Sequence, residues 1–199
     1  MTGFPAAFDE ITERFRSLPG VGKKSAVRMA FGITGMTVDE VEEFARSVSE
    51  ARRRIKKCKI CGNLSESDLC GICSDPGRDD EIICVVEDTR ALIAMEKAEN
   101  FNGRYHVLGG TVSPLDGRGP DDVNLFSLVD RVKGGLVKEV IVATGSTVDG
   151  ESTALYVANL IKPFGVKVTR IGRGIPAGGD LDFADEITIT HAIEGRREL

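Results

Sequence analysis

Four cysteines between residues 58 and 73 constrain the fold of this 199-residue chain more than any other feature. They form two Cys-x-x-Cys knuckles, with Cys58 and Cys61 in the first and Cys70 and Cys73 in the second. This spacing lets four thiolates surround one tetrahedral zinc ion. The segment around them is poor in apolar residues and cannot fold by burial alone. We therefore predict one structural zinc per chain, with every coordination position filled by protein and none open to a catalytic water.

Two disulfides or a redox dithiol are the alternatives to zinc. The chain opens without a basic leader and has no run of about 18 apolar residues, so we expect neither a secretory signal nor a membrane span. We expect a cytoplasmic protein, and a reducing compartment disfavours disulfides. The fifth cysteine, Cys84, stands in an apolar run and is predicted to be an inert core residue.

Charge is distributed unevenly along the chain. The net charge is −5, yet residues 1–59 hold 12 Lys and Arg against 8 Asp and Glu, whereas residues 60–199 hold 14 against 23. A basic front part on an acidic remainder indicates a localised site for a polyanion. The densest basic run consists of Arg52, Arg53, Arg54, Lys56, Lys57 and Lys59. This run either contacts DNA or balances the charge of the zinc thiolates, and the sequence leaves both interpretations open.

A glycine-rich turn separates two predicted amphipathic helices near the N-terminus. Gly20 and Gly22 permit a tight bend that exposes backbone N–H groups at the start of a helix beginning near Lys23, a geometry suited to a phosphate. Lys24 and Arg28 lie four positions apart on one face of that helix. An ordinary helical corner explains the glycines but not the adjacent cations. We therefore predict sequence-nonspecific DNA binding through Gly20, Gly22, Lys23, Lys24 and Arg28.

From Glu81 onward, short apolar runs alternate with helical patterns, which predicts a mostly parallel α/β sheet. The predicted strands are Ile82–Val86, His106–Leu108, Val140–Ala143, Val166–Ile171 and Ile187–Ile189. The predicted helices between them are Thr89–Asn100, Asp121–Lys133 and Glu151–Lys162. In the N-terminal part, a third helix is expected to bury an apolar face made by Val38, Val41, Phe44, Ala45, Val48, Ala51 and Ile55.

Three acidic residues follow two of the predicted strands. Glu87 comes after the first strand, and Asp149 and Glu151 come at the start of the helix that follows Val140–Ala143. Because the carboxyl ends of parallel strands meet at one edge, these acids are candidates for a Mg²⁺ site that resembles the Toprim arrangement of topoisomerases and primases. The alternative is helix capping by Asp88 and by Asp149 and Glu151. No partner nucleophile is identified, so any Mg²⁺ is not expected to be catalytic.

Taken together and in this order, the helical hairpin, the cysteine knuckles and the Toprim-like sheet resemble the RecR family of recombination mediators. The matching stretches run nearly from end to end. They are Ser17–Phe31 (SLPGVGKKSAVRMAF), Cys58–Cys73, Ile82–Asp88 (IICVVED), Tyr105–Gly110, Ser113–Gly117, Glu151–Ala158 (ESTALYVA), Gly178–Glu186 and Glu194–Glu198 (EGRRE).

This resemblance implies a non-catalytic protein of recombinational DNA repair. Family members form ring-like tetramers, act with RecO and RecF, and help to load RecA at single-stranded gaps. Their DNA-binding cations correspond to Lys24 and Arg28, and their Toprim acids to Glu87, Asp149 and Glu151, which serve either a partner contact or Mg²⁺. The chain departs from the family in having Lys23 where a proline is usual and Asp149 where a glutamate is usual.

The resemblance divides the chain into four parts: a helix–hairpin–helix module at 1–55, a four-cysteine zinc finger at 56–78, a Toprim domain at 79–171, and a C-terminal segment at 172–199 that packs on the sheet or on a neighbouring subunit. The alternative function is that of a Mg²⁺-dependent Toprim nuclease or primase-like enzyme. The missing nucleophile and the missing nucleotide-binding loop favour the mediator.

Overall fold

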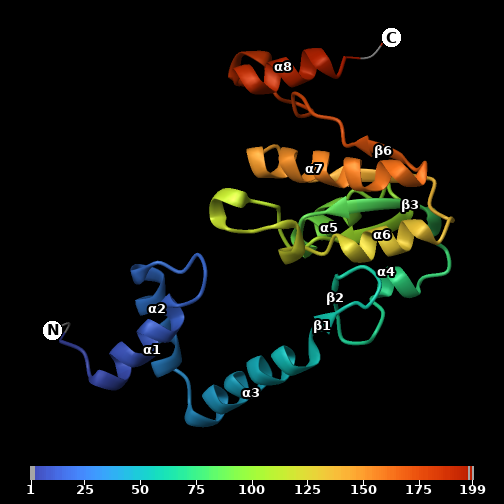
Figure 1. Cartoon of the computed structure of the whole chain (residues 1–199). Coiled ribbons are helices and arrows are strands. Elements are labelled where there is room, and N and C mark those ends of the chain that lie inside the picture. The colour runs from blue at the N-terminus through green and yellow to red at the C-terminus, as the bar shows by residue number, and fades with distance from the viewer. Residues whose placement is uncertain (1–2, 197, 199) are drawn as a thin grey trace. The chain divides into compact units, whose positions relative to one another are not determined.

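A computed structural model describes residues 3–196 and 198 of the chain (Figure 1). Met1, Thr2, Arg197 and Leu199 lie outside the described residues, and one of them, Arg197, belongs to the Glu194–Glu198 stretch named above. The chain divides into two compact units, Met1–Ile55 and Lys56–Leu199. No helix in the described residues is long and apolar enough to cross a bilayer.

The N-terminal unit is helical, as predicted. It contains α1 (Ala6–Arg16), α2 (Lys23–Thr34) and α3 (Val38–Arg54). Helices α1 and α2 form a hairpin held by Phe4, Phe8 and Phe31, with the rings of Phe8 and Phe31 4.7 Å apart. Small buried residues of α2, Ala26 and Ala30, allow the two helices to approach closely.

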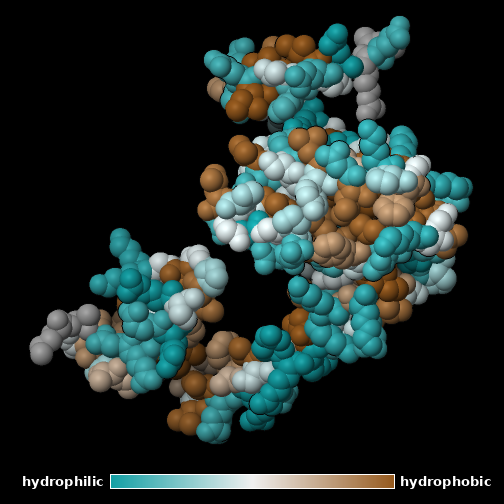
Figure 2. All heavy atoms as spheres, in the orientation of Figure 1, coloured by the Kyte–Doolittle hydropathy of each residue, from teal (hydrophilic) through white to brown (hydrophobic). Residues whose placement is uncertain are grey.

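Helix α3 differs from the prediction in one respect. It begins with a capping box in which the Thr37 hydroxyl accepts from the N–H of Glu40 and the Glu40 carboxylate accepts from the N–H of Thr37. None of its residues is buried, however, and Val38, Phe44 and Val48 are 74%, 47% and 55% exposed. The hydrophobic surface over α3 is visible in Figure 2. The expectation that this face forms core is therefore wrong for the described chain taken alone.

The second unit begins with the cysteine segment. Strands β1 (Lys56–Lys57) and β2 (Leu64–Ser65) pair antiparallel, and the short helix α4 (Gly71–Ser74) carries the second knuckle. Between β1 and β2, Gly62 adopts a left-handed φ of +76°, and a Cβ there would lie 2.9 Å from the carbonyl oxygen of Val107. The first knuckle therefore turns tightly against the neighbouring sheet.

That sheet has four parallel strands in the order β4-β3-β5-β6. The strands are β3 (Asp79–Val86), β4 (Gly103–Val107), β5 (Glu139–Ala143) and β6 (Lys167–Arg170). They correspond to four of the five predicted strands. Buried apolar residues on both faces explain why these strands read as continuous hydrophobic runs.

Helices cover both faces of the sheet. Alternate β3 residues face opposite cores: Ile83 and Val85 pack with α6 (Phe126–Lys133) and α7 (Val148–Ile161), whereas Cys84 and Val86 pack with α5 (Thr89–Glu96). Short 3₁₀ turns complete the connections; they are Pro114–Asp116, Pro120–Asp122, Lys162–Phe164 and Leu181–Phe183. Cys84 is fully buried, as predicted for an inert core residue.

The predicted strand Ile187–Ile189 is wrong, because these residues lie in helix α8 (Glu186–Glu194). The helix starts where the Asp185 side chain accepts a hydrogen bond from the N–H of Thr188 at 2.7 Å. His191, two residues beyond that run, lies on the same helix. A short β-branched run is ambiguous between strand and helix, and here the local cap determines the helix.

Candidate metal centre and nucleic-acid interface

The four knuckle cysteines converge on one point. Their sulfur atoms all lie within 4.8 Å of one another, and the sulfurs of Cys61 and Cys70 are 3.6 Å apart. Tetrahedral zinc with Zn–S bonds of about 2.3 Å requires sulfur separations close to about 3.8 Å. Cys58, Cys61 and Cys70 are buried and Cys73 is half-buried. The donor set and its spacing therefore fit a zinc ion enclosed by protein.

The protein around the knuckles favours the thiolate form of Cys58 and disfavours that of Cys61. Burial works against ionisation of Cys58, but N–H groups of Cys61, Cys70 and Ile60 outweigh it and lower the pKa of Cys58 to about 6. A hydrogen bond with Cys73 and burial raise the pKa of Cys61. A bound cation supplies the compensation that four adjacent thiolates require.

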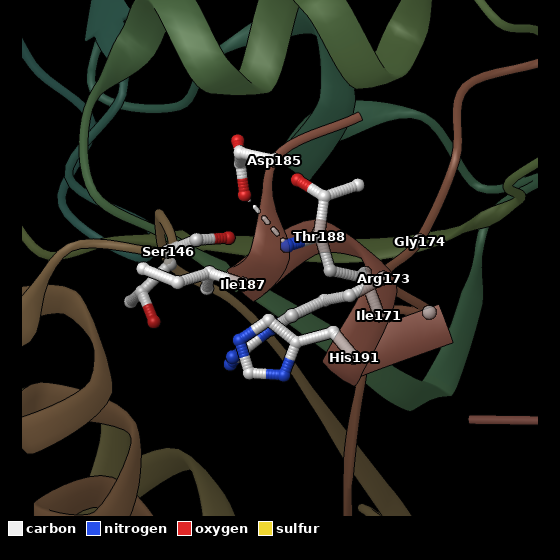
Figure 3. A pocket seen from close by; sticks show the side chains of 10 residues that line it. Ser146, Ile171, Arg173, Gly174, Asp185, Ile187, Thr188 and His191 are labelled. Atoms are coloured by element: carbon white, nitrogen blue, oxygen red, sulfur yellow. Dashed lines mark hydrogen bonds between the residues drawn. The ribbon is translucent and has the colours of Figure 1, made fainter. Parts of the chain in front are cut away.

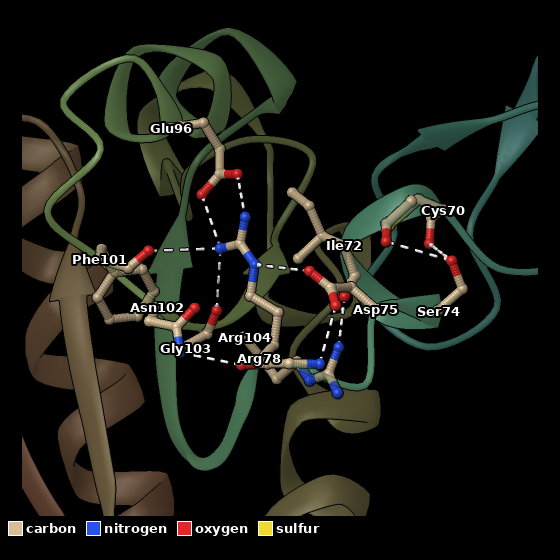
Figure 4. A network of polar contacts seen from close by, with 12 residues as sticks. Cys70, Ile72, Ser74, Asp75, Arg78, Glu96, Phe101, Asn102, Gly103 and Arg104 are labelled. Atoms are coloured by element: carbon tan, nitrogen blue, oxygen red, sulfur yellow. Dashed lines mark hydrogen bonds and ion pairs between the residues drawn. The ribbon is translucent and has the colours of Figure 1, made fainter.

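The zinc finger is attached to the edge strand β4. The N–H of Val107 donates to the carbonyl of Cys61 at 2.7 Å, and Arg104 donates to the carbonyl of Ile72 and to Asp80. The Ile72 side chain packs both on the cysteine cluster and on the core of the sheet. Knuckle and sheet are thus one packed structure (Figure 4).

A second arginine strengthens the same junction. Arg78 follows the second knuckle and forms a part-buried ion pair with Glu96 of α5. It also donates to the carbonyls of Phe101 and Gly103, each at 3.4 Å (Figure 4). The segment leaving the zinc finger is therefore fixed both to α5 and to the start of strand β4.

Positive charge near the thiolates comes from an unexpected residue. Arg131 of α6 lines a cavity of about 270 Å³ together with Cys73, and it donates to the carbonyl of Tyr105 at 2.6 Å. Burial lowers the pKa of Arg131, and the thiolates of Cys73, Cys61 and Cys58 counteract that effect. Within the basic run considered above, Lys56 and Lys59 instead pair with Asp68, at 3.0 and 2.6 Å.

Beside Arg131 lies a buried histidine. The Nε2 of His106 is 2.5 Å from the carbonyl oxygen of Asn124, and its Nδ1 is 3.4 Å from the Arg131 guanidinium. A neutral ring that donates from Nε2 and accepts at Nδ1 satisfies both contacts. Burial lowers the pKa of His106 to about 4, with a smaller contribution from Arg131.

In the N-terminal unit, the glycine turn has the predicted form. Gly20 adopts a φ of +80°, and the N–H of Val21 closes the turn on the carbonyl of Leu18 at 3.1 Å. Gly22 is the N-cap residue of α2 in extended conformation, with no side-chain cap. A Cβ at either glycine would meet open space. The first backbone N–H groups of α2 therefore receive no side-chain cap, and the surface beside them is open.

The basic residues at this turn are exposed, as the sequence suggested. Lys23 and Lys24 occupy the first turn of α2, which contains no acidic residue, and Arg28 follows one turn later. Within the described residues, none of these three cations forms an ion pair with a carboxylate. Positive side chains beside the positive end of a helix dipole are unfavourable unless an anion compensates them. The arrangement is thus suited to binding a phosphate.

The acidic residues lie at the carboxyl edge of the sheet but do not form a metal cluster. Glu87 accepts a hydrogen bond from the N–H of Gly145 at 2.7 Å. Glu151 is paired with Arg170 at 2.7 Å and also with Arg173. Asp149 lies in the first turn of α7. In the described part of the chain, the cysteines form the one group of at least three potential ligands close enough to hold a metal ion.

Helix capping explains only part of this edge. Asp88 caps α5 by accepting from the N–H of Ala91 at 2.9 Å, and this hydrogen bond lowers the pKa of Asp88. Helix α7 is capped by Thr147, not by Asp149 or Glu151. The sequence interpretation overlooked Arg170 and Arg173. The signal was their position at the carboxyl end of the last strand, where Arg170 is the final residue of β6 and Arg173 lies three residues beyond it.

Comparisons with known proteins cover almost the whole chain. Family models match the RecR helix-hairpin-helix at residues 8–52, the RecR four-cysteine zinc finger domain at 55–75, the Toprim domain at 81–172 and the RecR C-terminal region at 174–197. Two curated relatives, each called recombination protein RecR, come from two Type A strains of Clostridium perfringens, ATCC 13124 and 13. Each is 52% identical over 196 residues, which is 98% of both chains. With the four converging sulfurs, the zinc-finger match identifies one structural zinc as the cofactor.

Proposed function

The chain belongs to the RecR family of recombination proteins, and from this premise we propose that it is a recombination mediator that holds DNA at the start of α2. The contacts are the amides following Gly20 and Gly22 together with Lys23, Lys24 and Arg28. The protein is not an enzyme. The alternative of a Mg²⁺-dependent nuclease or primase-like enzyme is therefore set aside.

One observation carries the DNA-binding proposal. The first turn of α2 combines uncapped amides with exposed cations and has no acidic residue to balance them. A phosphate at this position satisfies the amides, the helix dipole and the side chains at once. None of these groups reads a base edge, so binding is independent of sequence and strongly dependent on salt.

We also propose that the protein works as a homo-oligomer, with a ring-like tetramer as the form the family implies. The exposed apolar face of α3 supports this proposal, because an exposed apolar face of that kind is typical of a surface that contacts another protein. Four linked copies also strengthen a weak local site by avidity. If each copy places Lys24 and Arg28 on phosphates of double-stranded DNA, the roughly 8 contacts give a plot of log binding constant against log salt concentration with a slope of about −7, as an upper bound.

Zinc and the domain division complete the structural part of the proposal. Cys58, Cys61, Cys70 and Cys73 are the four ligands, and the ion supplies a cross-link that holds the two knuckles together. The functional parts are 1–55, 56–78, 79–171 and 172–199. The ranges of the matching family models support this division.

Partners and location follow from the family. We propose that the protein acts with RecO and RecF and helps to load RecA at single-stranded gaps, with the edge around Glu87, Asp149 and Glu151 in contact with RecO. We place it in the cytoplasm, where reduced thiols remain available for zinc.

The DNA site is tested with the double variant Lys24→Ala/Arg28→Ala in the zinc-loaded full-length protein. Binding to labelled single-stranded DNA is measured by fluorescence anisotropy over a range of salt concentrations. Each phosphate contact contributes about 0.7 to the magnitude of the salt slope on single-stranded DNA. The variant is therefore expected to reduce the magnitude of that slope by roughly 1.4 per bound chain and to bind DNA at least about tenfold more weakly.

The matched control is Arg14→Ala/Arg16→Ala. It removes the same charge from the same helical hairpin, but these arginines are paired with Glu10 and Glu13 on α1. Its DNA affinity is expected to stay close to that of the wild type. Equal losses in both variants would show that net charge, and not the turn at α2, determines binding.

A further inference from the structure

One carboxylate at the carboxyl edge of the sheet is held by two arginines. The Nη2 atom of Arg170 lies 2.7 Å from Oε1 of Glu151, and Arg173 contacts the same oxygen. The side chains of Arg170 and Arg173 are only 22% and 17% exposed. This is a shielded ion cluster and not a set of solvated surface charges.

The same cluster includes the loop between β5 and α7. Arg170 donates to the carbonyls of Thr144 and Gly145, at 3.2 and 3.1 Å, while Glu87 accepts from the N–H of Gly145. Arg170 and Glu87 thus hold opposite ends of one residue. The oxygens of Glu87 and Glu151 that make these contacts point toward protein donors.

A divalent cation at this edge would have to bind the same two carboxylates, whose Oε1 atoms already face protein donors. Magnesium requires oxygen ligands at about 2.0–2.1 Å in near-octahedral geometry, and it binds through carboxylates that are free to turn toward it. Here Glu151 already accepts a charge-assisted hydrogen bond from Arg170 and forms an ion pair with Arg173. Their positive charges also repel any cation brought close to Glu151.

We propose that Arg170 and Arg173 take the place of a divalent cation at the carboxyl edge of the sheet. The edge is an internally compensated ion cluster that binds neither Mg²⁺ nor Mn²⁺. Two arginines from the end of β6 and the residues after it supply the positive charge for acids that follow β3 and β5. This inference goes beyond the proposed function, since it does not depend on DNA binding.

The same pairing gives the arginines a second role. Arg173 lies just beyond β6, at the start of the C-terminal segment, and lines a cavity of about 460 Å³ with Ser146, Thr188 and His191 (Figure 3). Its ion pair with Glu151 therefore attaches the beginning of that segment to the carboxyl edge. The charge that replaces the metal also fixes the path of the chain toward α8.

The test is a titration of the zinc-loaded full-length protein with Mn²⁺, followed by electron paramagnetic resonance of free Mn²⁺ without DNA. The wild type is expected to show no saturable Mn²⁺ site at millimolar concentrations. Arg170→Gln/Arg173→Gln is expected to gain one site per chain, with a dissociation constant at least about tenfold below the highest Mn²⁺ concentration at which the wild type shows no saturable binding, because a like-charge repulsion is removed. Adding Glu151→Gln to that variant removes the site.

The matched control is Arg90→Gln. Arg90 pairs with Asp88 at the same end of the sheet, but its side chain is 93% exposed, so no Mn²⁺ site is expected to appear. If the double variant does not fold, Arg173→Gln replaces it, because Arg170 then keeps its hydrogen bonds to the loop.

Two results would overturn the proposal. The first is saturable Mn²⁺ binding by the wild type that Glu87→Gln or Glu151→Gln abolishes. The second is a folded arginine variant that binds no Mn²⁺, which would show that the placement of the acids, and not the arginines, excludes the cation. Loss of DNA binding bears only on the proposed function and leaves this inference unaffected.

Discussion

The cysteine knuckles and the carboxyl edge of the sheet both collect groups that a metal ion can use, yet they treat charge in opposite ways. At the knuckles, four sulfurs lie within 4.8 Å of one another. The nearby Lys56 and Lys59 form ion pairs with Asp68 and not with the thiolates. At the edge, Glu151 is contacted directly by Arg170 and Arg173. The cysteine cluster therefore has room for a metal ion, whereas the acidic cluster already contains positive charge from protein side chains.

The number of potential ligands therefore does not define a metal site. A cluster of potential ligands binds a metal ion only when no cationic side chain of the protein already contacts the ligand atoms. The knuckles lie in tight turns around the sulfurs. At the edge, Arg170 at the end of β6 and Arg173 just beyond it both contact Glu151. Each of the following predictions tests one side of this contrast.

The largest effect is expected at the knuckles. Cys61→Ser removes a fully buried sulfur of the cluster, and loss of the metal site lowers the free energy of unfolding by more than about 4 kcal/mol. Zinc content by elemental analysis and thermal denaturation by circular dichroism measure the two consequences. Because the knuckles are attached to β4 through Val107 and Arg104, the loss extends into the sheet.

Cys84→Ala is the control for that variant. Cys84 is as buried as Cys61 but belongs to the core of the sheet, so its replacement costs about 1 kcal/mol and leaves zinc content unchanged. A Cys61→Ser protein that retains zinc and wild-type stability would contradict the assignment of the knuckles as a structural metal site.

The contrast between the two clusters also shows what sequence patterns reveal. Cysteine spacing is local, so the knuckles are predictable without any knowledge of the fold. The four sheet strands are predictable because burial on both faces leaves continuous apolar runs such as Ile82–Val86. The pairing of Glu151 with Arg170 is not, because it depends on β5 and β6 being neighbours in the sheet.

Two other features depend on context beyond the local pattern. The run Ile187–Ile189 has the composition of a strand, but Asp185 caps a helix there. The apolar face of α3 is recognisable as a stripe, yet periodicity does not tell whether a stripe is buried by its own chain. Local spacing in the sequence thus predicts metal ligands and amphipathic helices. Which charged side chains form ion pairs, and which apolar faces are buried, depends on contacts between segments that are distant in the sequence.

A pH effect of about 3 kcal/mol is expected beside the knuckles, at His106. Burial lowers its folded-state pKa to about 4, against 6.5 for an ordinary histidine. Above that ordinary value the ring is neutral in both states. As the pH falls through the interval between the two pKa values, the unfolded chain takes up a proton that the folded chain refuses, so stability declines by at most about 1.36 kcal/mol per pH unit.

Urea denaturation at several pH values measures this decline in the wild type and in His106→Gln. Glutamine retains a donor for the carbonyl of Asn124 but does not titrate. The difference in stability between the two proteins should therefore change with pH between 6.5 and about 4 and stay constant above that range. A constant difference throughout would show that His106 is already protonated in the folded protein or remains solvated.

A smaller effect, about 2 kcal/mol, is expected at the carboxyl edge. Glu151→Gln leaves Arg170 and Arg173 without their carboxylate in a shielded position, which lowers the free energy of unfolding. Glu87→Gln is the matched control, since an amide oxygen still accepts from the N–H of Gly145, and it should cost less than about 1 kcal/mol. Equal losses, measured by urea denaturation, would argue against internal compensation at Glu151.

The smallest expected effect concerns a buried cation near the thiolates. Arg131 shares a cavity with Cys73 and balances the thiolate charge from a distance, without contacting the sulfurs as the edge arginines contact Glu151. Arg131→Met is therefore expected to weaken zinc binding by about tenfold, the lower end of what groups around a metal site contribute. Competition with a chromophoric chelator measures the zinc affinity. Arg131→Lys keeps the charge and should restore most of it, whereas equal weakening by Met and Lys would mean that the hydrogen bond to Tyr105 matters and the charge does not.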